Sequence, residues 1–157
     1  MPTLPAGKRH NRGAVTFGPS DILAIMEKEV PFNRLLGIRG ESAESGRCVL
    51  VLPVRPELVG DPRRPALHGG VVSALLDTAG GLAAWSVLGD GESVSTVDMR
   101  VDFLEPAGLS GTLRAEAELV RKGNRVCHVR VALLQEGVLV AEGRAVYNIH
   151  RPAPAAE

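Results

Sequence analysis

Residues 68–88 read HGGVVSALLDTAGGLAAWSVL, and this stretch decides the fold of the chain. It begins with a pair of glycines and is then apolar or small on every face, with Asp77 as its one charged residue. A helix that is apolar all round lies either in a protein core or in a membrane. Asp77 and the interspersed small polar residues argue against a membrane span, and no basic clusters flank the segment. We therefore predict a buried helix from Val71 to Leu88, which the rest of the chain has to wrap.

The composition is that of one globular domain and does not favour nucleic acid or an acidic membrane as a partner. The chain has 157 residues with 18 basic and 18 acidic side chains, so no net field favours nucleic acid or an acidic membrane surface. Cys48 and Cys127 have no metal-ligand spacing, and we expect reduced core thiols, with a disulfide as the alternative. No continuous apolar segment follows the basic residues near the N-terminus, which predicts a cytoplasmic protein without a secretory signal.

The segments on either side of the helix predict mainly strands. Ser20 or Asp21 is expected to cap a short helix from Ile22 to Val30, which Pro31 ends. Turn signals and alternating patterns predict the following elements: a hairpin of residues 38–42 and 47–53, a loop over residues 55–66, and long strands over residues 94–104, 112–121, 125–135 and 138–149. A strongly bent antiparallel sheet round one helix satisfies this order, which makes the fold class α+β.

Three further expectations concern the helix end, one strand and the tails. The sequence Gly89-Asp90-Gly91 is expected to stop the central helix with a left-handed glycine cap. In the strand over residues 94–104, alternation assigns Val97 to the same face as Met99, Val101 and Phe103, and Thr96 to the opposite face with Asp98 and Arg100. The domain is predicted over residues 20–150, between a disordered tail of residues 1–19 and a frayed tail of residues 151–157.

The start of the central helix is one candidate for chemistry. Gly69 and Gly70 leave backbone N–H groups open to a ligand at the positive end of the helix dipole, where an oxyanion would be stabilised. The alternative is a tight turn or close packing without a ligand. His68, beside them, is either a bracing or capping residue or a proton-transfer group.

Asp77 is the sharper candidate because an ionised carboxylate is costly in an apolar helix unless it is paired or hydrogen-bonded. Such groups often have a tuned function, although a satisfied structural aspartate or one facing a partner subunit is the alternative. Eight residues separate Asp77 from Gly69, or ~12 Å at helical rise, so one Asp77 does not easily serve the Gly69 of its own helix. A symmetric dimer would bring the two together. The sequence contains no zinc, P-loop or dinucleotide motif and no G-x-S-x-G elbow.

Three segments resemble the hotdog-fold acyl-CoA thioesterases, and among these the PaaI-like branch of phenylacetate metabolism. They are HGGVVSALLDTAGGLAA (68–84), STVDMRVDFLEPA (95–107) and LVRKGNRVCHVRVALLQEGVLVAEGRAVY (119–147). The resemblance covers roughly residues 35–148, and its most specific part is HGG with an acid nine positions after the histidine. It implies a hydrolase that splits an acyl-CoA thioester, works as a homodimer or dimer of dimers, and needs neither metal nor organic cofactor.

The resemblance also implies roles for individual residues. Gly69 would polarise the thioester carbonyl through its N–H while His68 braces the turn. Asp77 of the other subunit would act as nucleophile or as general base, with the hydroxyl of Thr96, or of its neighbour Ser95, near the attacking water. The positions where relatives contact coenzyme A are matched here by Gly70, Asp98, Phe103, Arg121, Lys122, Gly123, Asn124, Arg125, Val126 and Asn148.

The chain departs from the family pattern in the loop before the HGG motif. Relatives often carry an asparagine about six residues before the histidine, whereas this chain has Pro62 there, with Asp61 as a partial substitute or a loop of different shape. Two other functions stay open on the same fold. One is a hydratase or dehydratase of enoyl or hydroxyacyl thioesters, and the other is a dimer that binds acyl-CoA without catalysis.

Overall fold

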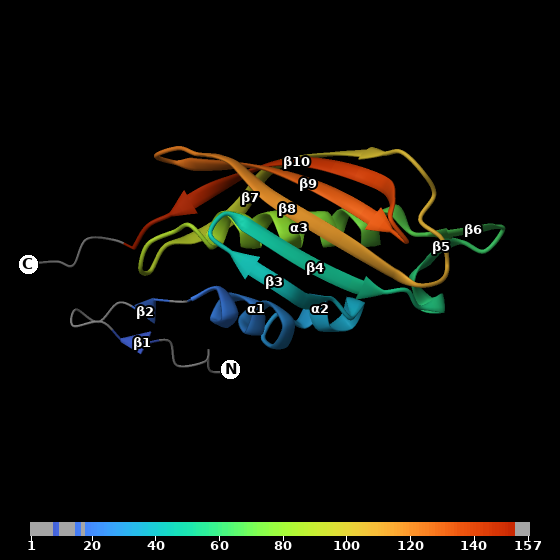
Figure 1. Cartoon of the computed structure of the whole chain (residues 1–157), viewed down its shortest axis with the longest axis horizontal. Coiled ribbons are helices and arrows are strands. Elements are labelled where there is room, and N and C mark those ends of the chain that lie inside the picture. The colour runs from blue at the N-terminus through green and yellow to red at the C-terminus, as the bar shows by residue number, and fades with distance from the viewer. Residues whose placement is uncertain (1–7, 10–14, 17, 153–157) are drawn as a thin grey trace, which may run out of the picture.

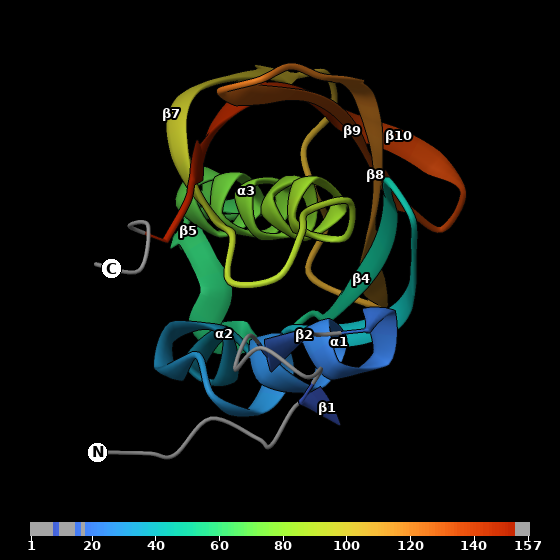
Figure 2. The same cartoon turned by 90° about the vertical axis from the view of Figure 1, so that its left-hand side faces the viewer.

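The computed structural model describes residues 8–9, 15–16 and 18–152 of the chain. A six-stranded antiparallel sheet curls round one long helix, and two short helices lie on the side that the sheet leaves open (Figures 1 and 2). The order of strands in the sheet is β3-β4-β8-β9-β10-β7. The α+β architecture predicted from the sequence, a bent sheet wrapped round one buried helix, is confirmed.

The strands lie close to their predicted positions because turn residues delimit them. They are β3 (Arg39–Glu44), β4 (Arg47–Pro53), β7 (Ser93–Phe103), β8 (Thr112–Lys122), β9 (Val126–Gln135) and β10 (Val138–His150). Glu136 and Gly137 both have positive φ, 49° and 79°, which is the conformation of the tight turns that join antiparallel strands. Cys48 and Cys127 are free and buried, so the reduced thiols are confirmed, and burial raises the pKa of Cys48 to about 12.

The central helix α3 (Gly69–Trp85) lies inside the curl of the sheet (Figure 2). Its buried residues cover one broad side of the helix: Val71, Val72, Leu75, Leu76, Ala79, Gly80, Leu82, Ala83 and Ala84. The opposite side is only half-buried and carries Ala74, Asp77, Thr78, Gly81 and Trp85. The helix ends at Trp85 rather than at Leu88, and its C-cap residue Ser86 has right-handed helical φ and ψ, so the predicted glycine cap is wrong. The Ser86 hydroxyl donates to the Ala83 carbonyl and accepts from the Gly46 N–H, which offers the chain an alternative to another helical turn.

The helices α1 (Pro19–Lys28) and α2 (Pro31–Leu36) pack below the sheet and α3. The first begins earlier than predicted, with Gly18 as its N-cap, and Asp21 accepts from the Gly18 N–H at 3.0 Å instead of being the cap itself. Pro31, expected to end the first helix, is also the first residue of the second. Asn33 is buried and donates to the main chain of Met26, which joins the two helices.

The segment expected as a loop over residues 55–66 forms a short 3₁₀ turn, Pro56–Leu58, and a hairpin of β5 (Val59–Asp61) and β6 (Arg64–Leu67). The hairpin leads directly into the start of α3, at one end of the molecule (Figure 1). A Cβ on Gly60 would lie 3.0 Å from the Cα of His68, so the missing side chain lets β5 pack against the residue that precedes the helix. The prolines of residues 55–66 thus predicted a loop, whereas the chain forms a two-stranded sheet there.

A β-bulge interrupts the alternation of β7. The register with β10 pairs Asp98 with Val146 and Thr96 with Tyr147, so Val97 has no partner. A bulge of this kind inserts one residue and shifts the strand behind it by one position. Val97 is therefore 63% exposed, and the assignment of Val97 to the face of Met99 and of Thr96 to the opposite face is wrong.

The ends of the chain are described only in part. Within the range expected as a disordered tail, β1 (Lys8–Arg9) and β2 (Val15–Thr16) pair in antiparallel orientation, and the rest of residues 1–17 lie outside the described residues, as do residues 153–157. Arg151, at the start of the expected C-terminal tail, is held by Glu92 and Asn124. No helix in the described part of the chain is long and apolar enough to cross a membrane.

Candidate active site

The first turn of α3 presents an unused donor. His68 is the N-cap residue, and its Nδ1 accepts from the Gly70 N–H at 2.9 Å. The His68 carbonyl accepts from the N–H groups of Val71 and Val72. Among the described residues none accepts a hydrogen bond from the N–H of Gly69, the first residue of the helix. The turn therefore holds one backbone donor ready at the positive end of the helix dipole.

Two hollows flank this turn. One of about 290 Å³ lies between the start of α3 and the end of β7, and Phe103 lies against Gly69, where a Cβ would meet its ring at 3.4 Å. The other, of about 510 Å³, is lined mainly by apolar side chains. These are Leu35, Leu36, Leu58, Val59 and Val71, with His68, Arg55 and Glu57 completing the lining. Apolar ligand groups thus have space on either side of the free N–H.

Asp77 lies two turns into α3, half-buried, and meets hydroxyl groups rather than cations. The Thr96 hydroxyl donates to Asp77 Oδ1 at 2.8 Å, and the bulge at Val97 is what turns Thr96 toward the helix. The structure thus brings Asp77 and Thr96 of one chain into direct contact. Ser95, the alternative to Thr96, lies on the other face of β7, with its hydroxyl 2.6 Å from Nε2 of His150.

Tyr147 is a part of this cluster that the sequence analysis missed. Its hydroxyl donates to the main-chain carbonyl of Asp77 at 2.9 Å and lies 3.3 Å from Asp77 Oδ1. Burial, with a smaller contribution from the charge of Asp77, raises the pKa of Tyr147 above its ordinary value. Gly80 was the available signal, since a small residue inside a core helix marks a close approach by a neighbouring group.

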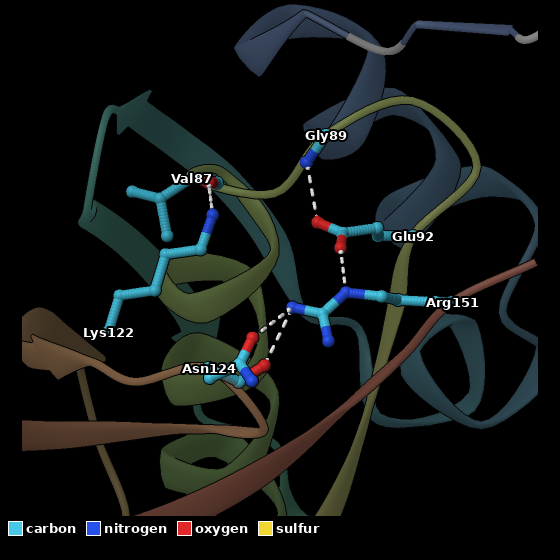
Figure 3. A network of polar contacts seen from close by, with 6 residues as sticks. All are labelled: Val87, Gly89, Glu92, Lys122, Asn124 and Arg151. Atoms are coloured by element: carbon cyan, nitrogen blue, oxygen red, sulfur yellow. Dashed lines mark hydrogen bonds and ion pairs between the residues drawn. The ribbon is translucent and has the colours of Figure 1, made fainter.

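The turn between β8 and β9 lies at the opposite end of α3 (Figure 3). Lys122 donates to the Val87 carbonyl, and the main chain of Asn124 accepts from Arg151 at 2.6 Å, which in turn pairs with Glu92. The positions matched to coenzyme A contacts therefore divide into groups. Gly70 and Phe103 lie beside Gly69, and residues 121–126 and Asn148 lie near the far end, where Asn148 pairs in register with Ser95 and Val126.

Asp98 belongs to neither end of the helix. It lines a shallow hollow on the outer face of the sheet, together with Arg100, His128, Arg130 and Arg144. Among the described residues no group of three or more histidine, cysteine, aspartate or glutamate side chains forms a metal site. The two candidate groups on α3, the free N–H at its start and the Asp77 carboxylate, are thus separated along the helix.

Comparison with known proteins assigns the family. Residues 65–142 match the model of the thioesterase superfamily. Over 134 residues, the chain is 36% identical to the medium/long-chain acyl-CoA thioesterase YigI of Escherichia coli K12, a match that covers 76% of this chain and 86% of that protein. The chain belongs to the thioesterase superfamily. Human acyl-coenzyme A thioesterase 13 is a more distant relative, 28% identical over 130 residues, with 79% of this chain and 89% of that protein covered.

Solved structures of the superfamily share the fold. A thioesterase family protein of Silicibacter pomeroyi superposes with a TM-score of 0.75 at 27% identity, covering 83% of this chain and 96% of that one. PaaI of Escherichia coli, from the phenylacetic acid degradation operon, superposes with a TM-score of 0.73 at 25% identity, covering 80% and 88%. The curled sheet round α3 is thus the hotdog fold of this superfamily.

The segment in which the sequence analysis noted a departure from the family pattern forms the β5–β6 hairpin. Asp61, considered as a partial substitute for the family asparagine, accepts from both the main chain and the guanidinium of Arg63 at 2.9–3.1 Å. These hydrogen bonds lower the pKa of Asp61 below its ordinary value. The carboxylate is thus engaged by Arg63 within its own hairpin.

Proposed function

We propose that this superfamily member hydrolyses acyl-CoA thioesters to a free acid and coenzyme A, with Asp77 as the group that attacks or activates water. The observation that carries the proposal is the half-buried Asp77 carboxylate in an otherwise apolar helix. Its Oδ1 accepts from Thr96, while no described residue donates to Oδ2. A carboxylate with one oxygen anchored and the other free is suited to work as a general base or a nucleophile.

The Gly69 N–H supplies the second half of the chemistry. It would donate to the thioester oxygen, which gains negative charge as the carbonyl carbon becomes tetrahedral. Asp77 either takes a proton from the attacking water or attacks the carbon itself, forming an anhydride that water then opens. In both cases the carbon–sulfur bond breaks and coenzyme A leaves as the thiolate, which takes up a proton. The reaction consumes one water and, as predicted from the resemblance, would need no metal and no cofactor.

A second copy of the chain would bring the two halves together. Asp77 and Gly69 of one helix are eight residues, or ~12 Å, apart, which is too far for both to act on one carbonyl. β7 is an edge strand of 11 residues paired only with β10, and unpaired edges are templates for another chain. Pairing of two β7 strands about a two-fold axis would make one continuous sheet and two sites.

The apolar hollow of about 510 Å³ beside His68 is a suitable place for the acyl chain. Each methylene group that it takes out of water would contribute about 0.8 kcal/mol to binding. The curated relative YigI is named for medium and long acyl chains. We propose the same substrate class for this chain, with the coenzyme A handle bound by residues 121–126 of the second copy.

A thiol-release assay over short, long and aryl acyl-CoAs, run with a chelator present, tests the proposal. The variant is Asp77→Asn, which keeps the size and the Oδ1 acceptor but removes the basic carboxylate. We expect it to fold and to lose about 10²-fold or more in kcat. The matched control is Glu116→Gln, an exposed carboxylate paired with Arg114 on β8 and away from the β7 edge, which should stay close to the wild type.

Three results would oppose the proposal. An Asp77→Asn variant as active as the control would remove the carboxylate from the mechanism. Loss of an enoyl thioester's absorbance without free thiol would indicate the hydratase reaction. Thermal stabilisation by acyl-CoA without any thiol release, in the wild type, would indicate a binding protein.

A further inference from the structure

Tyr147 and Thr96 face each other across neighbouring strands and reach the same carboxylate. They are direct partners in the register of β10 and β7. Thr96 donates to Asp77 Oδ1 at 2.8 Å, while the Tyr147 hydroxyl lies 2.9 Å from the Asp77 carbonyl and 3.3 Å from Oδ1. Tyr147 is 1% exposed and is the single tyrosine of the chain. One cross-strand pair therefore holds both the main chain and the side chain of Asp77.

The bulge at Val97 makes this pair possible. Met99 and Val101 pack toward α3, so regular alternation would send residue 97 inward and Thr96 outward. The extra residue reverses this, because the register shift falls between the pairs Asp98–Val146 and Thr96–Tyr147. Bulges commonly re-aim a side chain next to an active site. Here the re-aimed group is the hydroxyl that contacts Asp77.

Gly80 admits the phenol from the helix side. A Cβ at this position would lie 2.4 Å from the Tyr147 hydroxyl and 3.1 Å from its ring carbon Cζ. Glycine inside a helix is unfavourable relative to alanine. The unfavourable helix propensity of Gly80 is therefore offset by the hydrogen bond of the Tyr147 hydroxyl to the Asp77 carbonyl, which a side chain at position 80 would block.

We infer that Tyr147 is a positioning residue, which fixes Asp77 so that Oδ2 remains the oxygen that acts on water or on the thioester. The inference rests on the proposed function of Asp77. Both hydroxyls lie on the Oδ1 side, and no described residue donates to Oδ2. A tyrosine hydroxyl is already protonated in the neutral range, and burial raises the pKa of Tyr147 further, so Tyr147 remains a donor there.

The test is the Tyr147→Phe variant in the full-length protein, measured by thiol release. Phenylalanine keeps the buried ring and removes the hydroxyl alone. We expect kcat to fall about 10-fold while KM stays within about twofold, since a displaced carboxylate slows the reaction without weakening substrate binding. The control is Thr78→Val, which removes a hydroxyl that donates to the Ala74 carbonyl at 2.7 Å and lies 3.5 Å from Asn33 Oδ1, without touching the carboxylate. It should leave kcat within about twofold.

Repeating Tyr147→Phe in an Asp77→Asn background separates positioning from a structural role. A residue that acts through Asp77 should cause no further loss of rate there, whereas general damage to the fold would lower both rates equally. A wild-type kcat in Tyr147→Phe, or an undiminished loss in the double variant, would overturn the inference while leaving Asp77 in place. Asp77→Asn alone with full activity would instead overturn the proposed function on which the inference rests.

Discussion

The two adjacent glycines in the middle of α3 should respond in opposite ways to alanine. A Cβ on Gly80 would lie 2.4 Å from the Tyr147 hydroxyl, so the ring has to move, whereas a Cβ on Gly81 would meet the same ring at 3.5 Å, an ordinary contact. Both substitutions remove the cost of a helical glycine, about 1 kcal/mol. Gly81→Ala should therefore be neutral or stabilising.

Gly80→Ala should be destabilising in spite of its better helix propensity. Overpacking of a well-filled core costs roughly 1–3 kcal/mol. Loss of the Tyr147 hydrogen bond leaves the Asp77 carbonyl less well satisfied and costs about 1–2 kcal/mol more. The gain in propensity is the same for both variants and cancels, so they should differ by about 2–5 kcal/mol in the free energy of unfolding. For a domain of this size the difference corresponds to roughly 4–20 °C in Tm.

Thermal unfolding followed by the fluorescence of Trp85, the one tryptophan of the chain, and by circular dichroism measures this difference. In a Tyr147→Phe background the nearest atoms to the new Cβ are ring carbons at 3.1 and 3.3 Å, which small shifts can relieve. The cost of Gly80→Ala should therefore shrink there. Equal Tm values for Gly80→Ala and Gly81→Ala would refute the reasoning, because they would show that the hydroxyl does not fill the space above Gly80.

Two further predictions concern the helix start and the response to alkali. Gly69→Pro should fold, because proline suits the first position of a helix and His68, at φ −64° and ψ 130°, already has the conformation that a following proline requires. The variant should lose about 10²-fold or more in kcat, because the backbone N–H is deleted. The control Gly69→Ala keeps the N–H and should keep most of the activity. Equal losses of kcat in both variants would exclude the N–H as the donor. Burial raises the pKa of Tyr147 in the folded chain, whereas in the unfolded chain the phenol has the ordinary tyrosine pKa of ~10. The resulting stabilisation should be complete below pH ~10. It should be lost as the pH rises further, because the unfolded chain ionises first. Phenolate absorbance at alkaline pH should thus appear together with the loss of circular dichroism, and its appearance near pH ~10 in a fully folded protein would contradict the burial of the hydroxyl.

The sequence predicted the architecture because its signals were local. An all-apolar segment with one acid specified the buried helix, and turn residues such as Glu136-Gly137 delimited the strands. The same local reasoning failed at Val97, because a bulge depends on the register between two strands that the periodicity of one strand does not encode. It failed again at residues 59–67, where proline and glycine gave a loop signal and cross-strand hydrogen bonds formed a hairpin.

The sequence likewise predicted only some residues of the candidate site. Asp77 was identified because a carboxylate among apolar neighbours is conspicuous in any sequence. Tyr147 was not, since an aromatic residue in a core strand looks like ordinary packing until the partner of its hydroxyl is known. The choice between Thr96 and Ser95 likewise needed the structure, because the two adjacent hydroxyls point to opposite faces of β7.

The departures from regular structure round Asp77 are best explained together. A carboxylate in the core helix, a glycine in the middle of that helix and a bulge in the edge strand are each unfavourable by local rules. In this chain all three meet at one point, where Gly80 admits the Tyr147 hydroxyl and the bulge at Val97 turns Thr96 inward. Natural sequences keep such local conflicts mainly at functional sites, where another requirement outweighs stability. If position 77 had only a structural role, an apolar residue there, together with regular alternation in β7, would pack at lower cost. The convergence of the three features therefore argues that the carboxylate is retained for chemistry.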